Sequence, residues 1–173
     1  MKNVKYGMDS VIKGNTGEYY VLAELSRHGW TAAQTARNAR AYDVLARKGT
    51  RQVAIRVKTK TSDAHGFQWN AKADGTIFAE IGPHDFCVLV DIPAHHAEFP
   101  KFYIVPTHLI DSWLRADFDK WLNTPGTIKV QHSADNKRRL FYVDDDERTS
   151  HGYRIKLERY RANWDILEGN SGA

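Results

Sequence analysis

Four charged residues in the N-terminal part of the chain have the side-chain types that phosphate chemistry needs. Glu18 and Asp43 carry carboxylates, and Arg56 and Lys58 are two cations separated by a single residue. Two carboxylates at one place can hold a hard divalent cation, which prefers oxygen ligands. Such a cation polarises a phosphate and lowers the pKa of a bound water, while a nearby lysine stabilises the growing negative charge. These residues could therefore hydrolyse a phosphodiester if the fold brings them together.

A predicted hairpin over residues 41–61 presents three of these side chains. We expect one strand to end on Asp43 and the other to span about 52–59. Side chains alternate between the two faces of a strand. Arg56 and Lys58 therefore share one face, and three β-branched residues that suit a packed sheet share the other: Val53, Ile55 and Val57. The two cations need an anion beside them, and Asp43 is the nearest candidate in sequence.

Glu18 belongs to a predicted helix that precedes the hairpin. Asn15 or Thr16 can cap the helix N-terminus, and Gly29 stands where a left-handed C-terminal cap is needed. One apolar stripe at helical spacing contains Glu18, Val21, Leu22 and Leu25. Glu18 is thus expected in the first turn, facing the sheet. The alternative is that Glu18 only completes the helix start, where a carboxylate gains from the helix dipole.

The rest of the chain predicts an alternation of strands and helices. The expected elements, in order, are a strand at 30–37, a helix or long loop at 62–75, a buried central strand at 85–92, a strand at 101–105, an amphipathic helix at 107–123 and a strand at 127–131. The continuous apolar run DFCVLVDI is typical of a strand covered on both faces.

Some aromatic and basic residues could contact a nucleic acid. Trp69 stands in a polar stretch, where it can either fold back onto the core or stack on a base. The basic segment RIKLERYR includes Arg154 and Lys156, which can contact phosphates or lie on a solvated helix. Lys60 extends the basic face of Arg56 and Lys58. We therefore consider Lys60, Trp69, Arg154 and Lys156 as candidate nucleic-acid contacts.

Composition predicts one domain spanning 1–173, with a core at about 14–124 and a charged C-terminal extension at about 127–173. The chain has 173 residues, a net charge of +4 and one cysteine, Cys87. The single cysteine excludes an internal disulfide and favours a reducing cytoplasm. No apolar run is long enough for a membrane span, which needs roughly 20 residues. The positive charge mildly favours a polyanionic partner.

The sequence lacks the motifs of most common enzyme classes. It has no GxxxxGK[ST] phosphate loop and no GxGxxG dinucleotide motif. It also has no CxxC pair, no HExxH zinc motif and no GxSxG nucleophile elbow. The adjacent His95 and His96 point apart on an extended chain, so they make a poor metal pair.

Two stretches resemble the PD-(D/E)xK nuclease superfamily, which has the restriction-endonuclease-like fold. They are GNTGEYYVLAELSRHGW and YDVLARKGTRQVAIRVKTK, and the looser matches DFCVLVDI and KFYIVPTHLIDSWL look like bacterial members of that group. The resemblance covers about residues 14–124. It implies an α/β fold in which helices flank a mixed central β-sheet, with the core order αβββαβ.

The resemblance also implies roles for individual residues. Glu18 would be the helix glutamate, Asp43 the metal-binding aspartate and Lys58 the catalytic lysine, with Mg²⁺ or Mn²⁺ as cofactor. The family usually has Glu or Gln two positions before the lysine, but this chain has Arg56, which cannot bind a cation. Glu18 and Asp43 could suffice without that ligand. Otherwise another acid such as Asp63 or Glu80 could replace it, or catalysis could be lost.

Three functions therefore stay open at the level of sequence. The first is a metal-dependent endonuclease that hydrolyses DNA, with Arg56 retained among the catalytic residues. The second is a catalytically inactive nucleic-acid-binding or protein-interaction module of the same fold. The third is a structural protein in which Glu18, Asp43, Arg56 and Lys58 form an internal charge network. The expected partner is DNA and not a membrane, and a homodimer is one option for the assembly.

Overall fold

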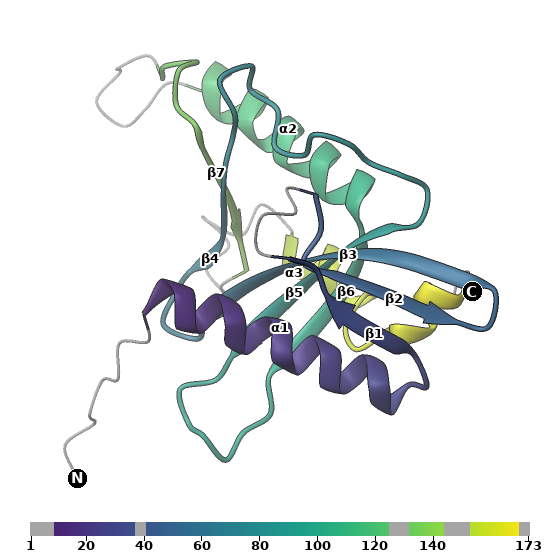
Figure 1. The fold of residues 1–173 in the computed structure, drawn as a ribbon. Helices are drawn as coiled ribbons and strands as arrows, with labels where there is room; N and C mark the ends of the chain where they lie inside the picture. Colours follow the sequence, from purple (N-terminus) through teal and green to yellow (C-terminus); the bar gives the residue numbers. More distant parts are fainter. Residues whose placement is uncertain (1–8, 37–40, 125–131, 144–152, 170–173) are drawn as a thin grey trace, which may run out of the picture.

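The computed structural model describes residues 9–36, 41–124, 132–143 and 153–169 (Figure 1). Their helices and strands, in chain order, are α1 (Ser10–Arg27), β1 (Thr31–Gln34), β2 (Val44–Lys48), β3 (Arg51–Thr61), β4 (Gly66–Asn70), β5 (Asp85–Ile92), β6 (Lys101–Pro106), α2 (Thr107–Asn123), β7 (Arg138–Tyr142), α3 (Tyr153–Glu158) and the 3₁₀ helix η1 (Trp164–Glu168). The strand predicted at 127–131 lies outside the described residues. No helix in these ranges is both long and apolar enough to cross a membrane.

A mixed five-stranded sheet in the order β1-β2-β3-β5-β6 forms the centre of the molecule (Figure 1). Strands β1, β2 and β3 form an antiparallel meander, β5 runs parallel to β3, and β6 returns antiparallel to β5. Strands β4 and β7 pair separately as a two-stranded ribbon. The predicted α/β class and mixed central sheet flanked by helices are confirmed, and the arrangement is consistent with a restriction-endonuclease-like fold.

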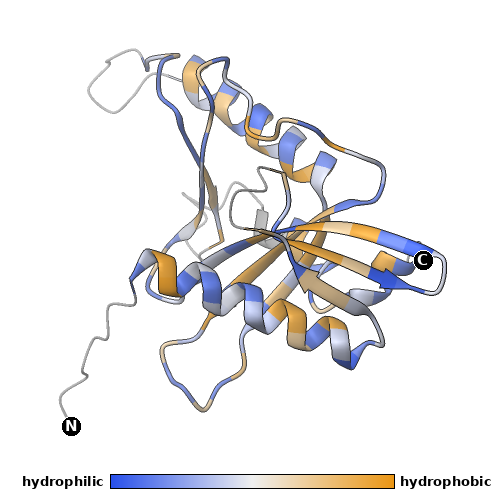
Figure 2. Ribbon diagram, viewed as in Figure 1, coloured by the Kyte–Doolittle hydropathy of each residue, from blue (hydrophilic) through white to orange (hydrophobic). Residues whose placement is uncertain are grey.

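Side-chain alternation gives the sheet two apolar faces, and each face is covered by a different layer. One core packs α1 and η1 against the sheet, with Val21, Leu25 and Trp164 among its buried residues. The other packs α2, α3 and the β4–β7 ribbon against the opposite face, with Phe67 and Leu114 fully buried. Hydrophobic positions accordingly gather along the central strands (Figure 2). The expectation that 85–92 is a strand buried on both faces is confirmed.

The connection from β3 to β5 differs from the predicted αβββαβ order. Residues 62–84 contain strand β4 and no helix, so the expected helix or long loop at 62–75 was wrong. The ribbon partner of β4 is β7, about 70 residues later in the chain. Long-range pairing of this kind leaves no local pattern in the sequence. The second long helix, α2, follows β6 instead of crossing between β3 and β5.

Helix α1 begins earlier than the sequence predicted. Asp9 is the N-cap residue, and its side chain accepts a hydrogen bond from the Val11 amide at 2.8 Å. The prediction that Asn15 or Thr16 caps this helix was therefore wrong, because both lie inside it. At the other end Gly29 has φ +78°, which confirms the left-handed residue predicted there.

Candidate functional site

Glu18 lies in the middle of α1 and not in its first turn, because the helix starts at Ser10. Its neighbour Gly17 is buried against β3, where a Cβ atom at residue 17 would overlap the Thr59 hydroxyl. Only glycine permits so close an approach of the helix to the strand. This contact holds α1 close to the sheet at β3, and it places the half-buried Glu18 near the end of β1. There the Gln34 Nε2 donates a 2.7 Å hydrogen bond to Glu18 Oε2.

Asp43 stands immediately before β2, so the prediction that a strand ends on Asp43 was wrong. Backbone bonds hold this residue between two strands: the Asp43 amide donates to Ile55 O, and the Thr35 amide donates to Asp43 O, both at 2.9 Å. Its Oδ2 accepts a 2.6 Å hydrogen bond from the Val57 amide. The half-buried carboxylate is thereby fixed beside β3, one residue from Lys58.

Glu18 and Asp43 line the same pocket, as the sequence proposal required. The pocket has a volume of about 180 Å³. It lies between α1, the end of β1 and the segment before β2, and its lining comprises Asn15, Glu18, Tyr19, Gln34, Thr35, Ala36, Tyr42 and Asp43. Its polar wall thus combines two carboxylates with the side-chain amides of Asn15 and Gln34. Oxygen donors of this kind suit a hard cation.

Burial shifts the pKa of Asp43 and the pKa of Lys58 in opposite directions, and each shift favours the neutral form of the side chain. Desolvation raises the pKa of Asp43, although the Val57 amide and the charges of Arg56 and Lys58 act in the opposite direction. Desolvation lowers the pKa of Lys58, and the negative charge of Asp43 partly offsets this effect. The Lys58 Nζ also lies 5.5 Å from the ring centre of Trp69. Ionisable groups whose pKa is shifted by burial and that lie near an opposite charge are common at functional sites.

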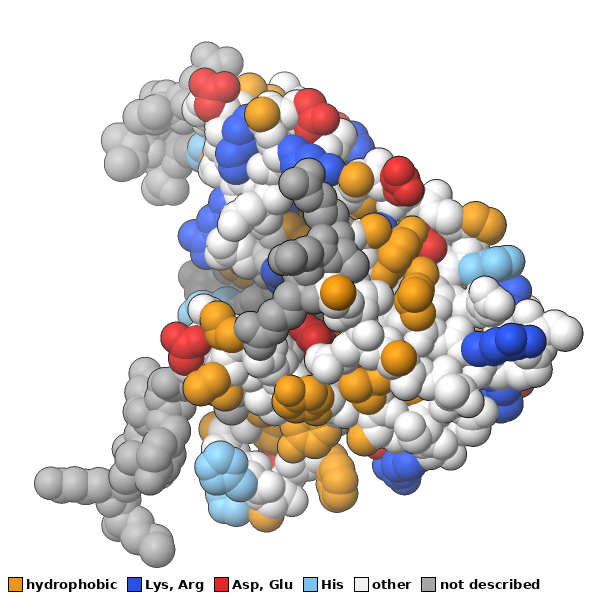
Figure 3. All heavy atoms as spheres, in the orientation of Figure 1, with side chains coloured by type: hydrophobic (Ala, Val, Ile, Leu, Met, Phe, Trp, Pro, Cys, Tyr) orange, Lys and Arg blue, Asp and Glu red, His pale blue; other side chains and the backbone are white. Residues whose placement is uncertain are grey.

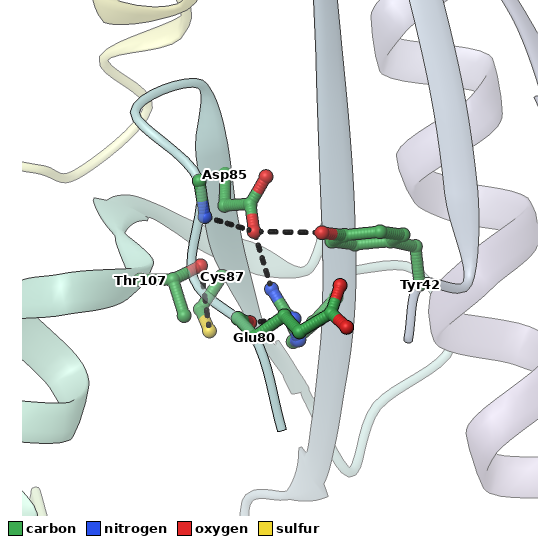
Figure 4. Close-up of polar contacts among 7 residues, drawn as sticks. Tyr42, Glu80, Asp85, Cys87 and Thr107 are labelled. Carbon is green, nitrogen blue, oxygen red and sulfur yellow. Dashed lines mark hydrogen bonds and ion pairs between the residues drawn. The ribbon is translucent and has the colours of Figure 1, made fainter. Parts of the chain in front are cut away.

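Arg56, on the same strand as Lys58, belongs to a separate cluster with Tyr42, Glu80 and Asp85. Figure 4 labels these three partners. Its guanidinium forms a 3.2 Å ion pair with Asp85 Oδ2 and donates a 2.7 Å hydrogen bond to Glu80 O. The Arg56 guanidinium also lies over the Tyr42 ring, 4.4 Å from its centre. Asp85 Oδ2 accepts two more hydrogen bonds at 2.9 Å, from the Tyr42 hydroxyl and the Gly82 amide. The anion that neutralises Arg56 is therefore Asp85 and not Asp43.

This pairing bears on two alternatives from the sequence. Glu18 bonds Gln34 and Arg56 bonds Asp85, so the predicted network of Glu18, Asp43, Arg56 and Lys58 does not form as proposed. Neither acid suggested as a substitute ligand lines the pocket. Asp63 accepts a hydrogen bond from the Thr61 hydroxyl, and Glu80 meets Arg56 through its backbone carbonyl.

The predicted nucleic-acid contacts are dispersed. Lys60 is buried in a 2.8 Å ion pair with Asp91, and Trp69 packs in the core, so the folded-back alternative describes Trp69. Lys156 is exposed and lies over the Trp113 ring, 5.7 Å from its centre. Arg154 belongs to α3, but its side chain lies outside the described residues. On the face seen in Figure 3 the described Lys and Arg side chains are interspersed with acidic ones.

Sequence reasoning missed Gln34, Tyr42 and Asp85. Tyr42 directly precedes Asp43, and Asp85 is the first residue of the apolar strand β5. The signal for Asp85 was the cation at position 56, because a buried cation needs an acidic partner nearby. Gln34 was hidden in a weakly apolar strand. Only the register of β1 against β2, in which Gln34 lies opposite Val44, places it beside Asp43.

The oxygen donors of the pocket residues match the ligands that Mg²⁺ prefers. Among the described residues no three His, Cys, Asp or Glu side chains are grouped as a metal site. Magnesium commonly uses only one or two carboxylates, together with waters and substrate phosphates. Two carboxylates with neighbouring amide oxygens meet that requirement, so the residues of the pocket fit such an ion.

Comparisons with known proteins give similarities at the level of structure only. No protein-family model matches the sequence, and no curated protein matches it. Among solved structures, the bacterial homing endonuclease I-Ssp6803I is similar with a TM-score of 0.48 and 16% identity, covering 94% of each chain. The Holliday junction resolvase Hjc of the archaeal hyperthermophile Archaeoglobus fulgidus has a TM-score of 0.39 and 20% identity, over 56% of this chain and 75% of its own. Similarities this weak do not assign this chain to either group.

Proposed function

We propose that this chain is a metal-dependent endonuclease that hydrolyses phosphodiester bonds in DNA. The observation that carries the proposal is the shared pocket, which is lined by Glu18 of α1 and by Asp43, the residue before β2. Lys58 is not part of this lining, but it lies on the adjoining strand β3, where it interacts electrostatically with Asp43. The resemblance of the sequence to PD-(D/E)xK nucleases supports the same reading. Glu18 and Asp43 would hold Mg²⁺ or Mn²⁺.

Each residue has a role that its surroundings support. When bound, the cation supplies charge neutralisation at the scissile phosphate and a bound water with a lowered pKa. Glu18 and Asp43 provide the negative oxygens that retain it. Lys58, held beside Asp43, orients the attacking water and donates a hydrogen bond to the phosphate oxygen on which charge grows. Burial lowers the pKa of Lys58, so this residue would give up a proton more readily than an exposed lysine does.

A second candidate is a catalytically inactive DNA-binding or protein-interaction module. The observation that favours it is Arg56, which stands where the family has an acidic or amide ligand and which is neutralised by Asp85. Loss of a ligand is a direct route to loss of catalysis. In that case the fold would retain a binding role without cleaving its partner.

A plasmid assay separates the two candidates. The protein is incubated with supercoiled plasmid and Mg²⁺ or Mn²⁺, beside Asp43→Ala and Lys58→Ala variants. We expect nicking by the parent alone, and its removal by EDTA. A gel-shift experiment with the same DNA is run in parallel. DNA binding without nicking supports the inactive DNA-binding module. If the protein neither binds nor nicks DNA, the endonuclease and the DNA-binding module are both contradicted, and only the protein-interaction form of the second candidate is left.

A further inference from the structure

The geometry points to Gln34 as the third protein oxygen donor for the cation, in place of the ligand missing at position 56. This inference rests on the proposed cation site at Glu18 and Asp43. It assigns the role to a different strand, because Arg56 lies on β3 whereas Gln34 ends β1.

Strand alternation directs Gln34 towards helix α1. Ala32, two residues earlier on the same face, packs against the core that includes α1. Gln34 accordingly reaches Glu18 and lines the pocket with Asp43. The next residue, Thr35, fixes the strand end to the Asp43 segment, through its amide to Asp43 O at 2.9 Å and through its hydroxyl to Tyr42 O. The three donors thus stand on backbone segments that are bonded to one another or packed together.

The hydrogen bonds already present leave one oxygen available on each of the three side chains. Gln34 donates through Nε2 to Glu18 Oε2, and Asp43 Oδ2 accepts from the Val57 amide. Within the described part of the chain, Glu18 Oε1, Asp43 Oδ1 and Gln34 Oε1 have no hydrogen-bond donor. An amide oxygen is a neutral hard donor that binds cations as carboxylates do. Two carboxylates and one side-chain amide therefore line a single pocket, and each has one oxygen that accepts no hydrogen bond within the described residues.

Arg56 cannot supply this oxygen. Its guanidinium repels a cation, and both of its terminal nitrogens are engaged, by Asp85 Oδ2 and Glu80 O. A ligand at position 56 would require this pair to be dismantled. Gln34 supplies an oxygen without disturbing it.

The competing explanation is that Gln34 only orients Glu18 by donating a hydrogen bond. A Gln34→Glu substitution distinguishes the two roles by whether cation binding tightens beyond that of the Gln52→Glu control. If residue 34 is a ligand, the carboxylate oxygen binds the cation directly and binding tightens. If residue 34 only orients Glu18, the same substitution removes the donor and the two carboxylates repel each other out of position, so binding does not tighten beyond that control. Gln34→Leu weakens binding under both explanations.

The test is calorimetric titration of the full chain with Mn²⁺ alone, without DNA. We expect Gln34→Glu to tighten Mn²⁺ binding on the order of tenfold, and Gln34→Leu to weaken it on the order of tenfold. Gln52, an exposed glutamine on β3 that is absent from this pocket, provides the matched controls Gln52→Glu and Gln52→Leu, which should bind as the parent does. Circular dichroism confirms that each variant is folded.

Two further variants separate this inference from the proposed function. If Glu18→Ala and Asp43→Ala lose Mn²⁺ binding but Gln34→Glu binds no more tightly than Gln52→Glu does, the role of Gln34 is overturned and the cation site stands. If Glu18→Ala and Asp43→Ala bind Mn²⁺ as the parent does, or if the parent binds none, the site itself is absent and both proposals fall.

Discussion

Asp43 and Asp85 lie beside the same strand, β3, yet their surroundings differ in every respect that matters for function. Asp85 is buried, and one of its oxygens accepts hydrogen bonds from Tyr42, Gly82 and Arg56. Among the residues that the structure describes, the Asp43 carboxylate has a single donor, the Val57 amide, and Asp43 lines a pocket. A carboxylate surrounded by donors holds the fold together, whereas a carboxylate whose burial exceeds its hydrogen bonding is available to a ligand.

The comparison also explains why the chain can tolerate Arg56. Asp85 pairs the positive charge of Arg56, and the guanidinium also lies 4.4 Å from the ring centre of Tyr42 and 5.2 Å from that of Phe78. Strand β3 therefore carries two cationic side chains with different partners. Arg56 contributes to the structure, and Lys58 remains beside Asp43.

The largest effect on stability is expected when the carboxylate of Asp85, which accepts three hydrogen bonds, is removed. Asp85→Ala leaves the guanidinium of Arg56, whose side chain is only 11% exposed, without a counter-charge. Breaking one partner of a buried pair costs about 3–5 kcal/mol of unfolding free energy. Urea denaturation measures this loss. The paired variant Arg56→Met with Asp85→Asn should recover most of it, and a double variant no more stable than Asp85→Ala would contradict the structural role.

The opposite outcome is expected at the pocket. Asp43→Asn should reduce plasmid nicking by at least about 100-fold, because a metal ligand matters no less than the residues that orient one. Its unfolding free energy should not fall, since asparagine can still accept the Val57 hydrogen bond. Asp85→Asn serves as the matched control and should keep most of the activity per folded molecule. Equal losses of nicking in both variants would erase the distinction between the two carboxylates.

A smaller effect is expected when the hydrogen bond from the Tyr42 hydroxyl to Asp85 is removed. Tyr42→Phe keeps the ring that covers Arg56 but removes the hydroxyl that donates to Asp85. We expect a loss of about 1 kcal/mol in unfolding free energy, the usual contribution of one hydrogen bond. The measurement is urea denaturation in parallel with Asp85→Asn. An unchanged stability would show that Asp85 is held without Tyr42.

The smallest effect is a dependence on pH. Burial raises the pKa of Asp43 above its ordinary value of 3.8, so its ionised form lowers the stability of the native state. In metal-free buffer, Asp43→Asn should be more stable than the parent at neutral pH. That advantage should shrink as the pH falls through the raised pKa towards 3.8, because native Asp43 then becomes neutral too. Urea denaturation across this range measures the difference, and an advantage that grows with acidity would contradict the direction of the pKa shift.

Much of the fold could be predicted from periodicity. The stripe of α1, the alternation in β3 and the unbroken apolar run of β5 each report a local environment, and local environment is what a sequence pattern encodes. The β4–β7 ribbon could not be predicted in this way. It joins β4 to β7, about 70 residues later in the chain, and although both short strands alternate between buried and more exposed positions, no spacing along the chain indicates that they pair.

The candidate site was predicted in part. Glu18, Asp43 and Lys58 were identified by residue type and order, and the structure brings Glu18 and Asp43 to one pocket. Gln34 and Asp85 were missed because their positions depend on strand register and on a parallel crossover. Those features arise from tertiary packing, which no spacing along the chain records.

The single thiol of the chain lies in the core between β5 and α2, and this position has a practical consequence. Cys87 is 1% exposed, contacts the Thr107 hydroxyl at 3.6 Å (Figure 4), and has a pKa raised by burial to about 12. Thiolates, not thiols, react with maleimides, so the native protein should ignore such reagents. A cysteine introduced at the exposed Tyr19, on the rim of the pocket, would then accept a fluorophore at one site only. Ligand binding at the pocket could therefore be followed by fluorescence without first replacing Cys87.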